Sequence, residues 1–111
     1  MKITTSVTQN RIVLLEVEGA VDAHTAFGLG ETLTSFLAKG HSQFLLDASH
    51  TEYLSSTGLR LLIEAWREAR QLGGEVRVFG TNAQVRRAIE LSGFEDLLYL
   101  GDTRQHALED W

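Results

Sequence analysis

The sequence contains no cysteine and no proline, and it has no long apolar run. The absence of cysteine excludes disulfides and thiolate metal sites. No stretch of about 18 apolar residues is present, so no transmembrane helix is predicted. The first ten residues, MKITTSVTQN, lack the apolar core of a signal peptide. We therefore expect a cytoplasmic protein that does not insert into a membrane.

Positive charge is also scarce, because 10 Lys and Arg stand against 15 Asp and Glu, a formal net charge of −5. Lys and Arg drive binding to nucleic-acid phosphates, so this balance argues against nucleic acid as the main partner. The 111 residues, with 43% hydrophobic content, are enough to bury one sizeable core. We expect one domain that spans residues 1–111.

The pattern of apolar residues predicts strands that alternate with helices. Strands are expected at residues 2–10, 11–19, 42–49, 75–80 and 97–100, and helices at 22–40, 55–72, 82–94 and 102–111. Asp22 is the expected N-cap of the first helix, and Gly40 is its expected stop. This order implies a mostly parallel or mixed sheet with helices packed on it.

The expected helix at residues 55–72 is the most clearly amphipathic segment. Apolar residues at helical spacing define one face: Leu59, Leu62, Ile63, Trp66 and Ala69. Gly73 and Gly74 follow it, and glycine commonly ends a helix because it adopts the left-handed conformation at low cost.

Patterns for catalysis or metal binding are weak. The four histidines are scattered, and only Asp22 and His24 lie at a close spacing, so no metal site is predicted. The GLG at residues 28–30 lacks the third glycine and the downstream acid of a dinucleotide loop. We expect these small residues to let a helix approach a neighbour or bend. Ser56, His24 and Asp22 form no recognisable triad, because no GxSxG motif is present. We predict no enzyme activity, no catalytic residue and no cofactor.

Three hydroxyl residues, Ser55, Ser56 and Thr57, stand directly before Gly58. Either Ser55 or Ser56 can cap the helix. Capping does not account for Thr57, which is a mediocre helix former. A helix N-terminus stabilises a phosphate, which adds about −1.5 to −2 charges. Thr57 is therefore a candidate phosphorylation site whose modification would repel a partner that fits the neutral surface.

Several motifs occur in an order that resembles the anti-sigma factor antagonists of the STAS domain family. They are GAVD at 19–22, DASHTEYL at 47–54, SSTGLRLL at 55–62, QLGGEVRVFG at 71–80 and NAQVRRAIELSGFEDLLYL at 82–100. The resemblance implies the STAS fold, with a mixed sheet of four or five strands and about four helices packed mainly on one face. It implies no catalysis by this chain.

The resemblance also implies a role in a bacterial partner-switching pathway. In this family the hydroxyl residue before the glycine, here Thr57, is phosphorylated by a partner kinase that is also the anti-sigma factor. Ser56 is the second choice. The unphosphorylated antagonist binds the kinase, phosphorylation blocks binding, and a phosphatase restores it. Ser55 stands where the family has an acidic residue.

The partner surface is expected to centre on the start of the helix at residues 55–72. The expected contact residues are Asp22, His24, Ser49, Ser55, Ser56, Thr57, Gly58 and Arg60. Two alternatives stay open. In the first, the chain is a non-switching STAS subunit of an ABC-type transporter or of a stress-signalling complex. In the second, it is an enzyme or a small-ligand binder with an apolar cavity, and we predict no such cavity.

Overall fold

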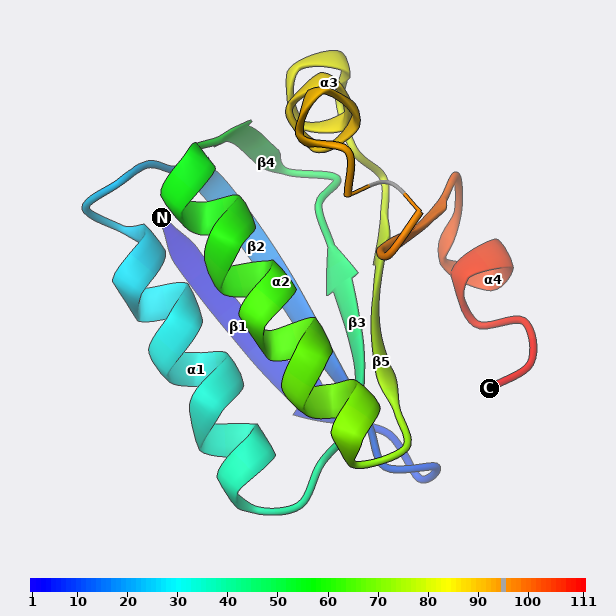
Figure 1. Cartoon of the computed structure of the whole chain (residues 1–111). Helices are drawn as coiled ribbons and strands as arrows, with labels where there is room; N and C mark the ends of the chain where they lie inside the picture. Colours follow the sequence, from blue (N-terminus) through cyan, green and yellow to red (C-terminus); the bar gives the residue numbers. More distant parts are fainter. Residues whose placement is uncertain (95) are drawn as a thin grey trace.

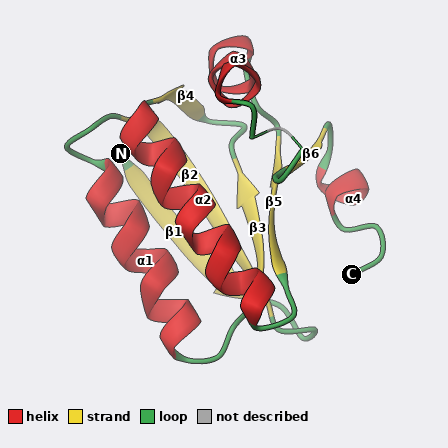
Figure 2. Cartoon of the chain, in the orientation of Figure 1, coloured by secondary structure: helices red, strands yellow, loops and turns green. Residues whose placement is uncertain are grey.

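The computed structural model describes residues 1–94 and 96–111 (Figure 1). Within these residues the chain forms one mixed sheet and four helices (Figure 2). The strands are β1 (Lys2–Val7), β2 (Ile12–Val21), β3 (Gln43–Asp47), β4 (Thr51–Leu54), β5 (Glu75–Phe79) and β6 (Tyr99–Gly101). The helices are α1 (Ala26–Ala38), α2 (Ser56–Gln71), α3 (Ala83–Ser92) and α4 (Arg104–Ala107).

The sheet has the strand order β1-β2-β3-β5-β6, with β4 paired to β2. β1 is antiparallel to β2, and the other pairs are parallel. The predicted mixed α/β fold is therefore confirmed, with six strands where four or five were expected. The extra strand is β4, which pairs with residues 19–21 of β2. Sequence analysis missed it because it is only four residues long and because it depends on β2 continuing two residues beyond Gly19.

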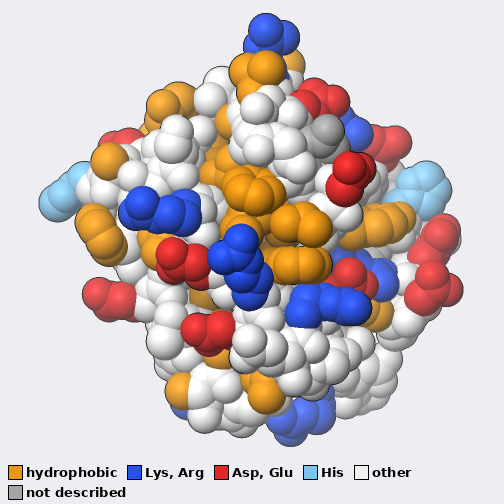
Figure 3. Space-filling model, viewed as in Figure 1, with side chains coloured by type: hydrophobic (Ala, Val, Ile, Leu, Met, Phe, Trp, Pro, Cys, Tyr) orange, Lys and Arg blue, Asp and Glu red, His pale blue; other side chains and the backbone are white. Residues whose placement is uncertain are grey.

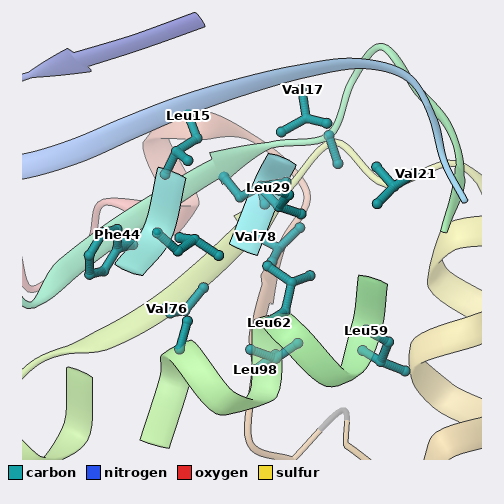
Figure 4. Packing of buried hydrophobic residues seen from close by; sticks show 14 of the residues in the cluster. Leu15, Val17, Val21, Leu29, Phe44, Leu59, Leu62, Val76, Val78 and Leu98 are labelled. Atoms are coloured by element: carbon teal, nitrogen blue, oxygen red, sulfur yellow. The ribbon is translucent and has the colours of Figure 1, made fainter. Parts of the chain in front are cut away.

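The main core lies between the sheet and helices α1, α2 and α3. Alternate residues of β2, Val13, Leu15 and Val17, point into it, as the period of a strand requires. Figure 4 shows the side chains of Leu29, Leu62 and Val78 packed together in this layer. The predicted apolar face of α2 is confirmed: Leu59, Leu62, Ile63 and Ala69 are buried, and Trp66 is partly buried against the same cluster.

Glycine allows close packing between α1 and α2. A Cβ at Gly30 would lie 3.2 Å from Cδ1 of Leu61 on α2. A Cβ there would require the Leu61 side chain to shift by a few tenths of an ångström, because packed helices leave little free space. The expectation that this glycine lets the helix approach a neighbour is thus confirmed.

A second, smaller cluster covers the opposite face of the sheet. Ile12, Leu14 and Leu45 pack there with Ala107 of α4 and with Trp111. Three helices therefore cover one face, and α4 lies beside β5 and β6 on the other (Figure 2). The helices were expected mainly on one face, and they are arranged in this way.

Arg77 of β5 holds the C-terminal segment against this second face. Its Nη1 donates hydrogen bonds to the carbonyl oxygens of Ala107 and Glu109, at 2.9 and 2.6 Å. Its Nη2 lies 2.7 Å from a carboxylate oxygen of Glu75, and its guanidinium stacks 4.0 Å from the ring centroid of Trp111. Arg77 is only 8% exposed, and these partners compensate for the desolvation of its charge.

No helix in the described part of the chain combines the length and the apolar composition needed to cross a membrane.

Candidate partner-binding site

Helix α2 begins where strands β2 and β4 end, and a backbone hydrogen bond joins its N-cap residue to β2. The backbone N–H of Ser55 donates to the carbonyl oxygen of Val21 at 2.8 Å. Ser55 is extended, and its Oγ accepts a hydrogen bond from the N–H of Gly58 at 3.1 Å. Ser55 is therefore the N-cap, which confirms the first of the two predicted caps and leaves Ser56 as the first helical residue.

Gly58 occupies a position where a side chain does not fit. A Cβ there would lie 2.8 Å from Cγ1 of Val21 and 2.9 Å from Cδ1 of Leu54. Ordinary carbon–carbon contacts are about 3.5 to 4.0 Å. The glycine thus lets the first turn of α2 pack directly onto the ends of β2 and β4. Its role is steric, and it explains why glycine follows the three hydroxyl residues.

The other two hydroxyl residues differ in exposure. Ser56 is exposed and Thr57 is half-buried. In residues 1–94 and 96–111 no hydrogen bond involves either hydroxyl oxygen. Residues four apart share a helix face, so Ser56 lies on the side of Arg60, and Thr57 lies on the side of Leu61, which faces α1. The two hydroxyls therefore point to different sides of the same helix start.

The turn that follows β2 is organised by Asp22. Its Oδ1 accepts hydrogen bonds from the N–H groups of His24 and Thr25, at 2.9 and 2.8 Å, and from Oγ1 of Thr25 at 3.1 Å. These bonds, above all those from Thr25, lower the pKa of the exposed Asp22 carboxyl. Helix α1 begins only at Ala26 with Thr25 as its N-cap, so the prediction that Asp22 caps this helix is corrected: Asp22 caps the preceding turn.

The Asp22 turn lies next to the start of α2, because Asp22 directly follows the residue whose carbonyl binds Ser55. His24 contributes its backbone N–H to the turn, and its side chain is exposed. The structure therefore brings together Asp22, His24 and the predicted residues at the start of α2.

Ser49 lies in a different part of this edge of the sheet. It follows β3, and its Oγ donates to Oδ1 of Asp47 at 2.5 Å and lies 3.2 Å from Nδ1 of His50. Its backbone approaches Gly80, where a Cβ would lie 3.1 Å from the Cα of Ser49. The hydrogen bonds found for Ser49 in the described residues thus connect it to its own loop, and none joins it to the start of α2.

A surface groove of about 510 Å³ runs between the first turns of α2 and helix α3. It is lined by Tyr53, Leu54, Ser55, Ser56, Leu59, Arg60, Gln84, Arg87, Ala88, Leu91, Ser92 and Phe94. A hydrogen bond connects α3 to β4, because Oε1 of Gln84 accepts a hydrogen bond from the N–H of Leu54 at 3.0 Å. In contrast, the space within the main core is only about 10 Å³, barely enough for one water molecule.

Sequence analysis named three residues of this groove as partner contacts, Ser55, Ser56 and Arg60. It missed the others, among them Tyr53, Arg87 and Leu91. One signal was present, because Leu91 stands two positions after Ile89. On a helix this places Leu91 away from the buried face. The contribution of α3 could not be predicted, since nothing in the sequence indicates which helix lies beside α2.

This fold, with its capped and hydroxyl-rich helix start, is that of a small STAS domain. A profile of the STAS domain family matches residues 4–107, so the chain belongs to this family. The anti-sigma-B factor antagonist of Staphylococcus aureus is 26% identical to it over 95 residues, covering 86% of this chain and 88% of that protein. BtrV of Bordetella bronchiseptica, a candidate anti-sigma factor antagonist, is 30% identical over 91 residues, 82% of this chain and 78% of BtrV.

A solved structure agrees with these relatives. The crystal structure of an anti-sigma factor antagonist from Mycobacterium paratuberculosis superposes with a TM-score of 0.83 at 28% identity. The superposition covers 96% of this chain and 92% of that one.

Proposed function

We propose that this chain is an anti-sigma factor antagonist, a non-catalytic bacterial module that acts in the cytoplasm. Its partner is an anti-sigma factor that is also a serine/threonine kinase. The unmodified chain binds this kinase, phosphorylation of Thr57 ends the binding, and a phosphatase restores it. The relatives named as anti-sigma factor antagonists support the binding role. The observation that carries the switch is the half-buried Thr57 at the capped start of α2, for whose hydroxyl no hydrogen bond is found in the described residues.

The start of α2 can accept a phosphate without unfolding. Ser55 Oγ already accepts a hydrogen bond from the N–H of Gly58. No hydrogen bond from the N–H of Ser56 or Thr57 is found in the described residues. Free N–H groups and the positive end of the helix dipole favour an anion there. A neighbour of the same fold, SpoIIAA, has structures in its unphosphorylated and its phosphorylated form, both with a TM-score of 0.76 to this chain.

Phosphorylation would change the charge of the surface and leave the fold in place. The phosphate adds about −1.5 to −2 charges at pH 7. It would stand beside the Asp22 turn, whose carboxyl is already negative. A partner that packs closely on the neutral helix start would then meet a strongly hydrated dianion. The nucleotide and metal ion for the reaction belong to the kinase in this proposal.

Ser55 favours a second candidate function, because an uncharged residue stands where the family has an acid. In this second candidate function, the chain is a non-switching STAS subunit of an ABC-type transporter or of a stress-signalling complex. A Thr57→Asp variant distinguishes the two. A switch loses its partner with this variant, whereas a constitutive subunit keeps it.

The primary test is mass spectrometry of the chain recovered from its native cells together with its bound proteins. We expect phosphate on Thr57 in one fraction and a kinase only in the unmodified fraction. A Thr57→Ala variant should bind the kinase and never release it, and Ser56→Ala is the matched control. Phosphate found only on Ser56 would make Ser56, and not Thr57, the phosphorylation site of the switch. No phosphate under any growth condition, with a constant partner, would refute the switch.

A further inference from the structure

We propose that the groove between α2 and α3 binds a segment of the partner protein in which acidic side chains stand beside apolar ones. Arg60 and Arg87 would bind the acidic side chains. This inference rests on the proposed function for the existence of a protein partner. It does not depend on phosphorylation of Thr57.

The charge of the groove is opposite to that of the whole chain. Arg60 and Arg87 are the charged residues among those that line it, whereas the chain carries a net charge of −5. Both arginines are exposed, and neither forms an ion pair within residues 1–94 and 96–111. A local cationic groove on an acidic protein selects a locally acidic partner, since complementary charges raise association rates and exclude wrong partners. Nucleic acid would be repelled by the rest of the surface.

The groove also carries apolar surface that water would otherwise cover. Leu91 is 73% exposed and Tyr53 is 44% exposed. The rest of the apolar lining comes from Leu54, Leu59, Ala88 and Phe94. Figure 3 shows apolar side chains gathered between α2 and the segment that follows α3, with basic side chains beside them. Tyrosine and arginine around an apolar surface are the residue types that dominate binding energy at protein interfaces.

The groove reaches the hydroxyl residues at the start of α2. Ser55 and Ser56 line it, and Ser56 and Arg60 lie on one face of the helix. A bound acidic segment would therefore lie beside the first turn of α2. A phosphate on Ser56, the second-choice site, would repel the segment and compete with it for Arg60, because arginine pairs strongly with phosphate. Thr57 lies on the side of Leu61, so a phosphate on it would act on the helix start and not within the groove.

A random peptide library displayed on phage tests the groove with the full, unmodified chain. We expect the enriched peptides to combine Asp or Glu with Leu or Phe. Fluorescence anisotropy should then show at least about tenfold weaker binding to the Arg60→Gln/Arg87→Gln variant, equivalent to about 1.4 kcal/mol. Leu91→Ala should weaken binding as well. Binding should also weaken as salt is raised.

Matched controls lie on the same helix, outside the groove. Arg67→Gln removes another exposed arginine of α2, and Leu72→Ala removes the exposed leucine that forms its C-cap. Both should leave peptide affinity unchanged. The proposal is overturned if the library yields no enriched peptide, if enriched peptides lack acidic residues, or if they bind the double arginine variant as tightly. An unphosphorylated Thr57 in cells would refute the switch and leave this result unaffected.

Discussion

Replacing Gly58 with alanine tests whether steric contact positions the start of α2. The added Cβ would lie 2.8 Å from Val21 Cγ1 and 2.9 Å from Leu54 Cδ1, both on buried side chains. Val21 is β-branched and stiff, so the helix start has to move. Overpacking of this kind costs about 1 to 3 kcal/mol, and alanine recovers about 1 kcal/mol of helix propensity. We expect a net loss of about 1 kcal/mol, which lowers the Tm by about 4 °C.

Gly28→Ala is the matched control, because Gly28 is also the third residue of its helix. A Cβ there would meet only Cε of Met1, at 3.4 Å, which is an ordinary contact with a flexible side chain. This variant should gain up to about 1 kcal/mol from helix propensity. Urea unfolding of both variants should therefore show shifts of opposite sign. The steric explanation is wrong if Gly58→Ala is as stable as the unmodified chain.

Three further predictions concern the cap, the C-terminal segment and the Asp22 turn. Ser55→Ala should cost about 1 kcal/mol in urea unfolding, whereas Ser56→Ala should change stability by less than about 0.5 kcal/mol; equal effects would contradict the assignment of the cap. Arg77→Met should cost about 3 kcal/mol, because buried charged hydrogen bonds are lost, and hydrogen exchange should speed up in residues 104–111; unchanged exchange would show that Arg77 does not hold this segment. The lowered pKa of Asp22 contributes stability above its unfolded pKa, and this contribution is lost as the pH falls below about 4. Asp22→Asn cannot titrate, so its free energy of unfolding should fall less between pH 7 and pH 3 than that of the unmodified chain. An equal fall would show that the hydrogen bonds of the Asp22 carboxylate do not stabilise the turn.

Periodicity and capping chemistry were sufficient to predict most helices and strands. Leu59, Leu62 and Ile63 recur at helical spacing, and burial of that face is a local consequence of the pattern. The exact beginning of α1 was harder to predict, since Asp22 caps a turn as readily as a helix. Strand β4 was missed because its pairing depends on the far end of β2, and no local pattern carries that information.

By itself, the sequence determined that a hydroxyl-rich helix start exists and that its first serine can cap it, because capping involves residues only three positions apart. It left open whether Ser55 or Ser56 is the cap, and the structure assigned the cap to Ser55. Only the tertiary structure decided why Gly58 is needed, since the atoms that exclude a side chain come from β2 and β4. The same holds for the groove: Arg60 and Arg87 belong to different helices, and the packing of both helices on one sheet brings them together.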